Sequence, residues 1–265
     1  MSTDDLKQDH PRATLRHAAS KVPEVTVAFW ITKALTTGMG ESSSDYLVHR
    51  LPPILAVALG AIALAIALAI QFAAPRYVPW TYWLAVAMVG VFGTMAADVL
   101  HVGLGVPYLV STAFFAVALA AIFGLWYRSE RTLSIHSIHT RRRELFYWAA
   151  VMTTFALGTA AGDMTAVTLH LGYLASGVMF AVVIAIPALA HWRFGMNAIL
   201  AFWFAYIATR PLGASFADWM GVSHVRGGLD WGAGRVSLAL AALIIGCVIY
   251  LSLAVAGRDE MHGRP

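Results

Sequence analysis

One motif occurs four times along the chain: an aromatic residue followed by Trp, then Gly ten residues and Asp fifteen residues after the Trp. The spacing is identical in all four copies, which chance does not explain, so the chain consists of four related units. The motif residues are Trp30, Trp83, Trp148 and Trp203; Gly40, Gly93, Gly158 and Gly213; and Asp45, Asp98, Asp163 and Asp218.

Long apolar runs contain these motifs. The 265 residues are 59% hydrophobic and 12% charged, whereas a soluble domain carries about 25% charged residues. Between Leu51 and Ala74 the only polar side chain is Gln71, and about 20 apolar residues suffice to cross a bilayer. The sequence therefore predicts an all-α integral membrane protein with eight spans, at about 24–48, 51–73, 80–103, 107–127, 145–170, 172–192, 197–220 and 235–256.

The domain organisation follows from these spans. One membrane domain is expected over residues 23–257, between a polar, disordered tail over residues 1–22 and a short tail over residues 258–265. The first residues do not have the pattern of a cleavable signal peptide. The four repeats are expected at about 23–75, 76–130, 140–193 and 194–257.

The basic residues are distributed unevenly between the two sides. Thirteen Lys and Arg residues lie in the tails and the even-to-odd connections, and three lie on the opposite side. The positive-inside rule therefore predicts that both termini are cytoplasmic. Topology thus accounts for the net charge of +4, and a nucleic-acid partner is not expected.

Four tandem two-helix repeats, each with a Trp, resemble an uncharacterised family of bacterial membrane proteins built from that repeat. The resemblance covers residues 21–257 approximately, and rests on the motif given above. It implies the eight-helix architecture and a bacterial inner-membrane location, and it implies no activity.

Helical geometry indicates which side chains share a face. Fifteen residues separate the motif Trp and Asp by about 22 Å along a helix and by about 60° around it, so the two lie on one face. The motif Gly residues are expected to let neighbouring helices approach closely. The shared face also carries Glu41, Thr94, Thr159, His101 and His170, with Lys33 at its edge and Arg210 within it.

Ionisable residues inside a membrane cost about 3 kcal/mol each, and here they are confined to the odd-numbered spans. We therefore expect the odd spans inside, with their polar faces inward, and the even spans outside as parallel repeats. Lys33 and Arg210 would balance carboxylate charge. Asp45 and Asp218 lie near span ends, where solvation is the alternative, and the Trp residues are expected to anchor the chain at the membrane interface.

This residue set favours a cation transporter or exporter. Carboxylates, hydroxyls and histidines suit Mn²⁺, Mg²⁺ or Zn²⁺ better than Cu⁺, and the single Cys247 offers no thiolate cluster. Asp98, Asp163 and His101 are the predicted metal ligands. Glu41 and Asp45 are one turn apart and repel when both are ionised, so this pair is the candidate proton carrier.

Two other classes stay open at this point. A ring of Asp residues around a pseudo-fourfold axis would also suit a passive cation channel. A membrane-embedded enzyme or cofactor protein ranks lower, because the sequence has no phosphate-binding or nucleophile motif. No covalent cofactor is expected, the partners are the lipid bilayer and the transported cation, and a homo-oligomer is left open.

Overall fold

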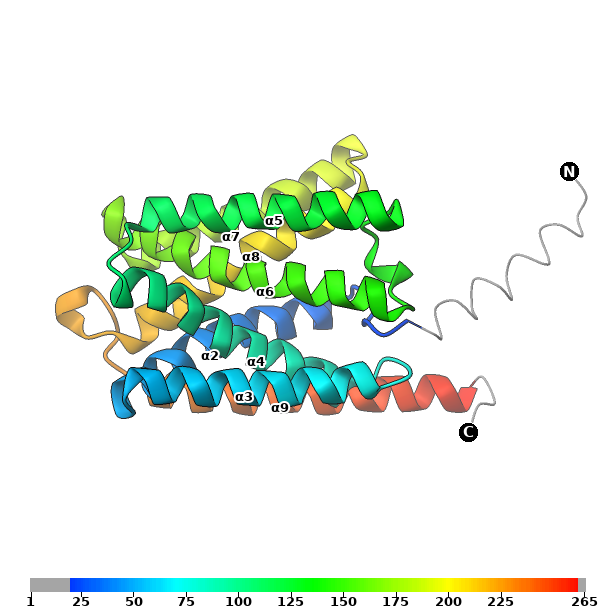
Figure 1. The fold of residues 1–265 in the computed structure, drawn as a ribbon, viewed down its shortest axis with the longest axis horizontal. Coiled ribbons are helices and arrows are strands. Elements are labelled where there is room, and N and C mark those ends of the chain that lie inside the picture. The colour runs from blue at the N-terminus through cyan, green and yellow to red at the C-terminus, as the bar shows by residue number, and fades with distance from the viewer. Residues whose placement is uncertain (1–19, 262–265) are drawn as a thin grey trace, which may run out of the picture.

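The computed structural model describes residues 20–261, which contain eight α-helices and no β-strand. The helices lie side by side in a bundle (Figure 1). In chain order they are α2 (Val27–Arg50), α3 (Pro53–Ala73), α4 (Pro79–Asp98), α5 (Tyr108–Glu130), α6 (Arg141–Asp163), α7 (Tyr173–Phe194), α8 (Ala198–Gly221) and α9 (Ala233–Met261). Two π-helical segments, η1 (Val99–Gly103) and η3 (Met164–Thr168), continue α4 and α6. The all-α prediction is confirmed. When η1 and η3 are counted with α4 and α6, the helix bounds lie within about five residues of the predicted spans.

Local sequence signals account for several helix starts. The Thr26 hydroxyl accepts a hydrogen bond from the Phe29 N–H at 3.2 Å, and Thr140 caps α6 in the same way. Such a cap satisfies an N–H group that has no partner inside the helix. Pro53 and Pro79 begin α3 and α4, where the missing N–H group of proline is not needed.

Seven of the eight helices, α3 to α9, are long and apolar enough to cross a membrane. The exception is α2, which contains Lys33, Glu41 and three consecutive serines. Lys33 and Glu41 are buried inside the bundle, where other helices surround them. The chain is therefore a membrane protein by composition and helix length.

Burial divides the helices into two groups. α2, α4, α6 and α8 pack on one another in sequence order, and α8 also packs on α2. In the apolar stretches of α4, α6 and α8, between 56% and 61% of the residues are buried, against 22% or less in α3, α5, α7 and α9. Most of the surface of the second group is thus available to lipid.

The motif aromatic residues join successive repeats at one end of the bundle, which we call the Trp end. In each repeat the first aromatic ring contacts the Trp of the next, and Phe202 of the fourth repeat contacts Trp30 of the first at 5.7 Å between ring centroids. The other pairs are Phe29–Trp83 at 5.7 Å, Tyr82–Trp148 at 5.7 Å and Tyr147–Trp203 at 6.2 Å. These contacts follow the repeats around a closed ring.

The Trp residues pack inside the protein. Trp83, Trp148 and Trp203 are at most 4% exposed and belong to the main hydrophobic core. The interpretation of these three as anchors that face the membrane interface is therefore wrong. Their large ring surfaces are buried against other aromatic rings, which stabilises the bundle.

The motif glycines form a second closed set of contacts. Each lies against the residue three positions before the Gly of the next repeat. A Cβ atom at Gly40 would lie 2.7 Å from the Gly90 backbone, closer than real Cβ atoms approach. The other three pairs are Gly93 with Phe155, Gly158 with Arg210 and Gly213 with Thr37. The absent side chains thus permit close approach of neighbouring helices.

The chain before α2 packs against the Trp end. Lys21 Nζ donates a hydrogen bond to Glu144 Oε2 at 2.7 Å and another to the Phe72 carbonyl at 3.1 Å. The sequence predicts a disordered tail through residue 22, but Ser20, Lys21 and Val22 are buried. The prediction fails at these three residues because Lys21 has a carboxylate partner. The remainder of that tail, residues 1–19, lies outside the described residues.

The end of α9 lies near the same segment. The predicted tail over residues 258–265 begins inside this helix, which continues to Met261. Arg258 Nη1 lies 2.7 Å from Glu24 Oε2. The described ends of the chain therefore lie at the same end of the bundle, and residues 262–265 lie outside the described residues.

Candidate cation site

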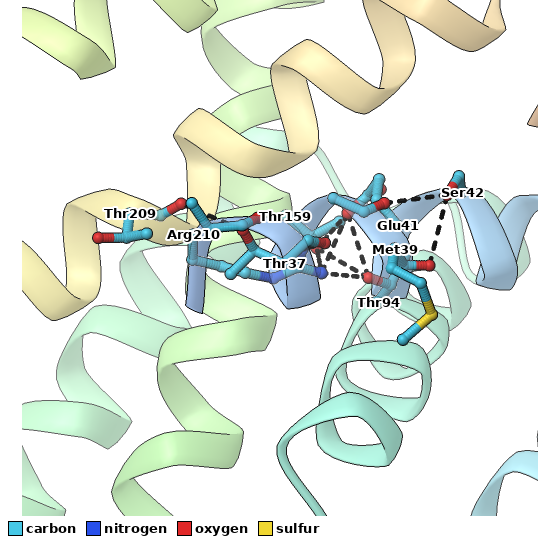
Figure 2. Close-up of polar contacts among 10 residues, drawn as sticks. Thr37, Met39, Glu41, Ser42, Thr94, Thr159, Thr209 and Arg210 are labelled. Carbon is cyan, nitrogen blue, oxygen red and sulfur yellow. Dashed lines mark hydrogen bonds and ion pairs between the residues drawn. The ribbon is translucent and has the colours of Figure 1, made fainter. Parts of the chain in front are cut away.

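A layer of polar side chains joins all four repeats. Arg210 of α8 extends toward Glu41 of α2, and its Nη2 lies 3.0 Å from Glu41 Oε2 (Figure 2). The same Nη2 contacts the hydroxyls of Thr94 and Thr159, at 3.0 Å for Thr159, and each hydroxyl also lies 3.1 Å from Glu41 Oε2. Nη1 donates to the Thr37 carbonyl at 2.6 Å.

This layer is closed to solvent. Arg210 is 0% and Glu41 3% exposed. A buried ion pair is tolerated where further hydrogen bonds satisfy the two charged groups. The threonines provide such bonds to Glu41 Oε2 and to both Nη atoms of Arg210, whereas Arg210 Nε has no hydrogen-bond partner within the described residues. Arg210 is thus paired with a carboxylate, whereas Lys33 forms no ion pair within the described residues. Glu41 belongs to the Arg210 pair, and no hydrogen bond joins it to Asp45 in this part of the chain.

Beyond this layer, toward the carboxyl ends of α4 and α6, lies a group of three potential metal ligands. Asp98, His101 and Asp163 each offer one ligand atom, and these atoms all lie within 4.8 Å of one another. The two carboxylates are half-buried and His101 is buried. The structure therefore brings together, from the second and third repeats, the three residues that the sequence predicts as metal ligands.

Both aspartates stand at the start of a π-helical turn. The Leu104 N–H donates to the Val99 carbonyl at 2.9 Å, and the Leu169 N–H donates to the Met164 carbonyl at 2.9 Å. These bonds span five residues, so the two turns are wider than α-helical ones and occupy equivalent positions in repeats two and three. Such single π turns are frequent at functional sites.

Neighbouring groups determine which nitrogen of His101 can act as a ligand. Its Nε2 lies 2.6 Å from Ser111 Oγ. Ser111 Oγ also lies 3.1 Å from the Tyr108 carbonyl, to which it can donate its own proton while it accepts one from Nε2. In that tautomer Nδ1 has a free lone pair, and within the described residues Nδ1 is buried without a hydrogen-bond partner. A fixed second nitrogen is typical of metal-bound histidines.

The two other motif aspartates line a cavity of about 990 Å³ beside α2, α8 and the start of α9. Asp45 and Asp218 share its wall with Arg226, Asp230 and Ser43. We call this end of the bundle, with the four motif aspartates, the Asp end. Within the described residues none of the four Asp carboxylates forms a hydrogen bond or an ion pair with a protein group, so all four are available as ligands.

The remaining predicted site residues divide between the polar layer and the surface. Thr94 and Thr159 belong to the Arg210 layer and are buried. His170 is exposed after η3, with a φ of 56°, and is not part of the group at Asp98. Sequence reasoning missed Ser111 and Tyr108 of α5, which orient His101 through a hydrogen bond and a ring contact at 4.5 Å. No sequence signal singles out these two residues, because the contact depends on the turn at η1.

These features define an all-helical membrane protein built from tandem two-helix units. A family model described as Repeat of Unknown Function (DUF347) matches residues 28–77, 81–132, 146–197 and 201–255. The chain belongs to this family, and each matched segment contains one complete copy of the motif. The resemblance inferred from the motif is confirmed. No curated protein and no solved structure matches the chain.

Proposed function

We propose that the protein is a cation transporter or exporter, with a divalent metal such as Mn²⁺ as the substrate and Asp98, Asp163 and His101 as its ligands. The observation that carries this proposal is the approach of their three ligand atoms to within 4.8 Å. Two carboxylates balance the charge of a divalent ion, and the imidazole adds a borderline donor. Oxygen and imidazole ligands suit Mn²⁺ or Zn²⁺, whereas Cu⁺ prefers sulfur.

The spacing of the group suits an ion that binds and leaves again. Ligand atoms stand about 2.0–2.2 Å from metals of this size, so they lie up to roughly 4.4 Å apart around one ion. Small side-chain rotations bring atoms within 4.8 Å of one another into this range. Three protein ligands leave further positions for water, and transport requires binding weak enough for release.

The cavity at the Asp end is the proposed access route. Asp45 and Asp218 line it, and their carboxylates would attract a cation before it reaches the ligand group. The same wall carries Asp230 and the arginines Arg50, Arg226 and Arg235, so its three carboxylates are matched by three guanidinium groups. A binding site preceded by a wide, partly acidic cavity is consistent with a carrier open at one end.

We further propose the orientation of the protein in a bacterial inner membrane. The four repeats run parallel about an axis along the membrane normal, with α2, α4, α6 and α8 inside and the other four helices facing lipid. The Trp end and both termini are cytoplasmic. The asymmetric Lys and Arg distribution supports this orientation, and so does the Arg258–Glu24 ion pair, which holds the two ends of the described chain together.

A passive channel along the pseudo-fourfold axis is less well supported. Such a channel needs a continuous polar path for water and ions. The Arg210–Glu41 layer crosses the bundle with both side chains buried, and its cation would repel a permeating cation. Alternating access around a closed layer, as in a carrier, accords better with this arrangement. We propose no enzymatic activity.

Equilibrium binding of Mn²⁺ to the detergent-purified protein tests the proposed site. Wild-type protein should bind one Mn²⁺ per chain with the ligands named above. Asp98→Asn keeps the side-chain size but removes a charge and should weaken binding at least tenfold. Glu260→Gln is the control, because Glu260 is an exposed carboxylate near the end of α9 and lines neither the ligand group nor the cavity. Equal binding by wild type and Asp98→Asn would refute the site.

A further inference from the structure

The Lys33 amine is the most unusual buried group outside the ligand group. Lys33 is 0% exposed, and its Nζ has no hydrogen-bond partner within the described residues. Two aromatic ring faces lie close to the amine: Nζ is 4.3 Å from the Tyr206 ring centroid and 4.5 Å from that of Phe155. Arg210 has a carboxylate partner in Glu41, whereas Lys33 Nζ has no carboxylate partner within the described residues and lies against aromatic rings.

The position of Lys33 separates it from the proposed metal ligands. It lies twelve residues before Asp45 on α2, which corresponds to about 18 Å along the helix axis. Along α2, the Arg210 layer lies between the level of Lys33 and the level of Asp45. Thr37 and Glu41, which both contact Arg210, follow Lys33 at successive turns of this helix. Lys33 therefore does not coordinate an ion at Asp98, and any influence between them acts through charge.

The charge of Lys33 depends on its surroundings. A buried ammonium without an acceptor is unfavourable, and ring faces compensate only in part. Arg210 adds repulsion, because its guanidinium lies 4.7 Å from the same Phe155 ring. A lysine in such surroundings can release its proton, whereas an arginine keeps its charge.

The other titratable groups near Lys33 are few. On α8 these are Tyr206 and Arg210, and on α2 the next is Glu41, which is paired with Arg210. Tyr147 of α6 and Tyr82 of α4 lie one turn nearer the Trp end, with their hydroxyl oxygens 2.5 Å apart. α9, which packs on α2, has only Cys247 and Tyr250 over residues 236–257, and neither is fully buried. None of these groups forms an ion pair with Lys33.

We propose that Lys33 is the proton-carrying group of the transport cycle. When a divalent cation binds at Asp98, Asp163 and His101, the Lys33 ammonium releases one proton and becomes a neutral amine; when the cation leaves, the amine takes up one proton again. Repulsion between the bound cation, Arg210 and Lys33 couples the two events without direct contact. This inference rests on the proposed function, and it assigns the proton to Lys33 in place of Glu41 and Asp45.

The pH dependence of Mn²⁺ affinity tests this coupling. Mn²⁺ binding to purified protein should be measured from pH 6 to 9, together with proton release in a weakly buffered solution containing a pH indicator. Ligand deprotonation contributes to the slope of log Kd against pH in every variant. Lys33→Met should retain Mn²⁺ binding but release one proton fewer per bound ion than wild type. Its slope of log Kd against pH should therefore be smaller in magnitude than that of wild type, by up to one, over part of the range from pH 6 to 9.

Lys33→Arg is the second variant, because it keeps the positive charge but cannot release a proton. It should bind Mn²⁺ at least tenfold more weakly than wild type at high pH, with the same reduced proton release as Lys33→Met. If Lys33→Met does not fold, Lys33→Arg alone decides the question. Proton release equal to that of wild type in the folded variants would overturn the role of Lys33 and leave the metal site intact. A wild-type protein that binds no Mn²⁺ would overturn the proposed function and this inference together.

Discussion

Gly213 of the fourth repeat lies directly against Thr37 of the first, so that a Cβ atom at Gly213 would overlap the Thr37 side chain. This contact closes the ring of repeats that begins with Gly40 against Gly90. The aromatic contacts close in the same way, since Phe202 meets Trp30. Two independent sets of contacts thus join the last repeat to the first.

Gly213→Ala should destabilise the protein. The new methyl group must displace Thr37 and separate α2 from α8, and overpacking of this kind costs about 1–3 kcal/mol. We expect a melting temperature in detergent several degrees below that of wild type.

Gly246→Ala is the matched control, because a Cβ atom there meets no atom within 4 Å. Alanine is favoured over glycine inside a helix by about 0.5–1 kcal/mol, so this variant should melt at or above the wild-type temperature. If Gly213→Ala had the same melting temperature as wild type and Gly246→Ala, the close contact with Thr37 would not be a constraint on the fold.

Arg210→Met should have a larger effect. It leaves the Glu41 carboxylate buried without its ionic partner, and breaking a buried pair in this way costs about 3–5 kcal/mol. The double variant Glu41→Leu with Arg210→Met removes both charges and should recover most of the lost stability. Melting temperatures of the single and double variants provide the measurement. If the double variant were no more stable than Arg210→Met, the unpaired carboxylate would not be the cause of the loss.

The repeat motif predicted a large part of the fold. Its Trp-to-Asp spacing indicates how long each of these helices must be, and it also indicates that the Trp and the Asp lie on one face of the helix. The motif glycines stand where two helices touch, and a residue without a side chain is a direct sign of such contact. Asp98, His101 and Asp163 could also be predicted as a group, because ionisable side chains inside a membrane must face one another.

The failures have a common physical origin in long-range contacts and local turns. The prediction that His170 lies on the shared polar face assumes that the α-helix continues, but η3 widens the turn and His170 has a positive φ. Sequence periodicity does not report where an α-helix changes to a π-helix. Likewise, the pairing of Arg210 with Glu41 depends on how far a flexible side chain reaches across the bundle, and helical spacing alone does not determine that reach.

The proposed orientation can be checked by labelling with a membrane-impermeant maleimide. The only cysteine, Cys247, is first replaced by Ser, and His136→Cys or Val225→Cys is then introduced. Both positions are exposed. In intact spheroplasts the reagent should label position 225, which lies at the Asp end, and should label position 136 only after the membrane is opened. Labelling of position 136 in sealed spheroplasts would reverse the proposed topology.

Mn²⁺ flux into sealed proteoliposomes tests the central claim most directly. Wild-type protein is compared with Asp98→Asn, Asp163→Asn and the control Glu260→Gln, all at equal reconstituted amounts. Because each of the first two variants removes one of the two charges that balance the ion, we predict that both lose at least tenfold in rate, while Glu260→Gln transports as wild type does. Transport by Asp98→Asn and Asp163→Asn at the wild-type rate, or no protein-dependent flux in wild type, would contradict the proposal.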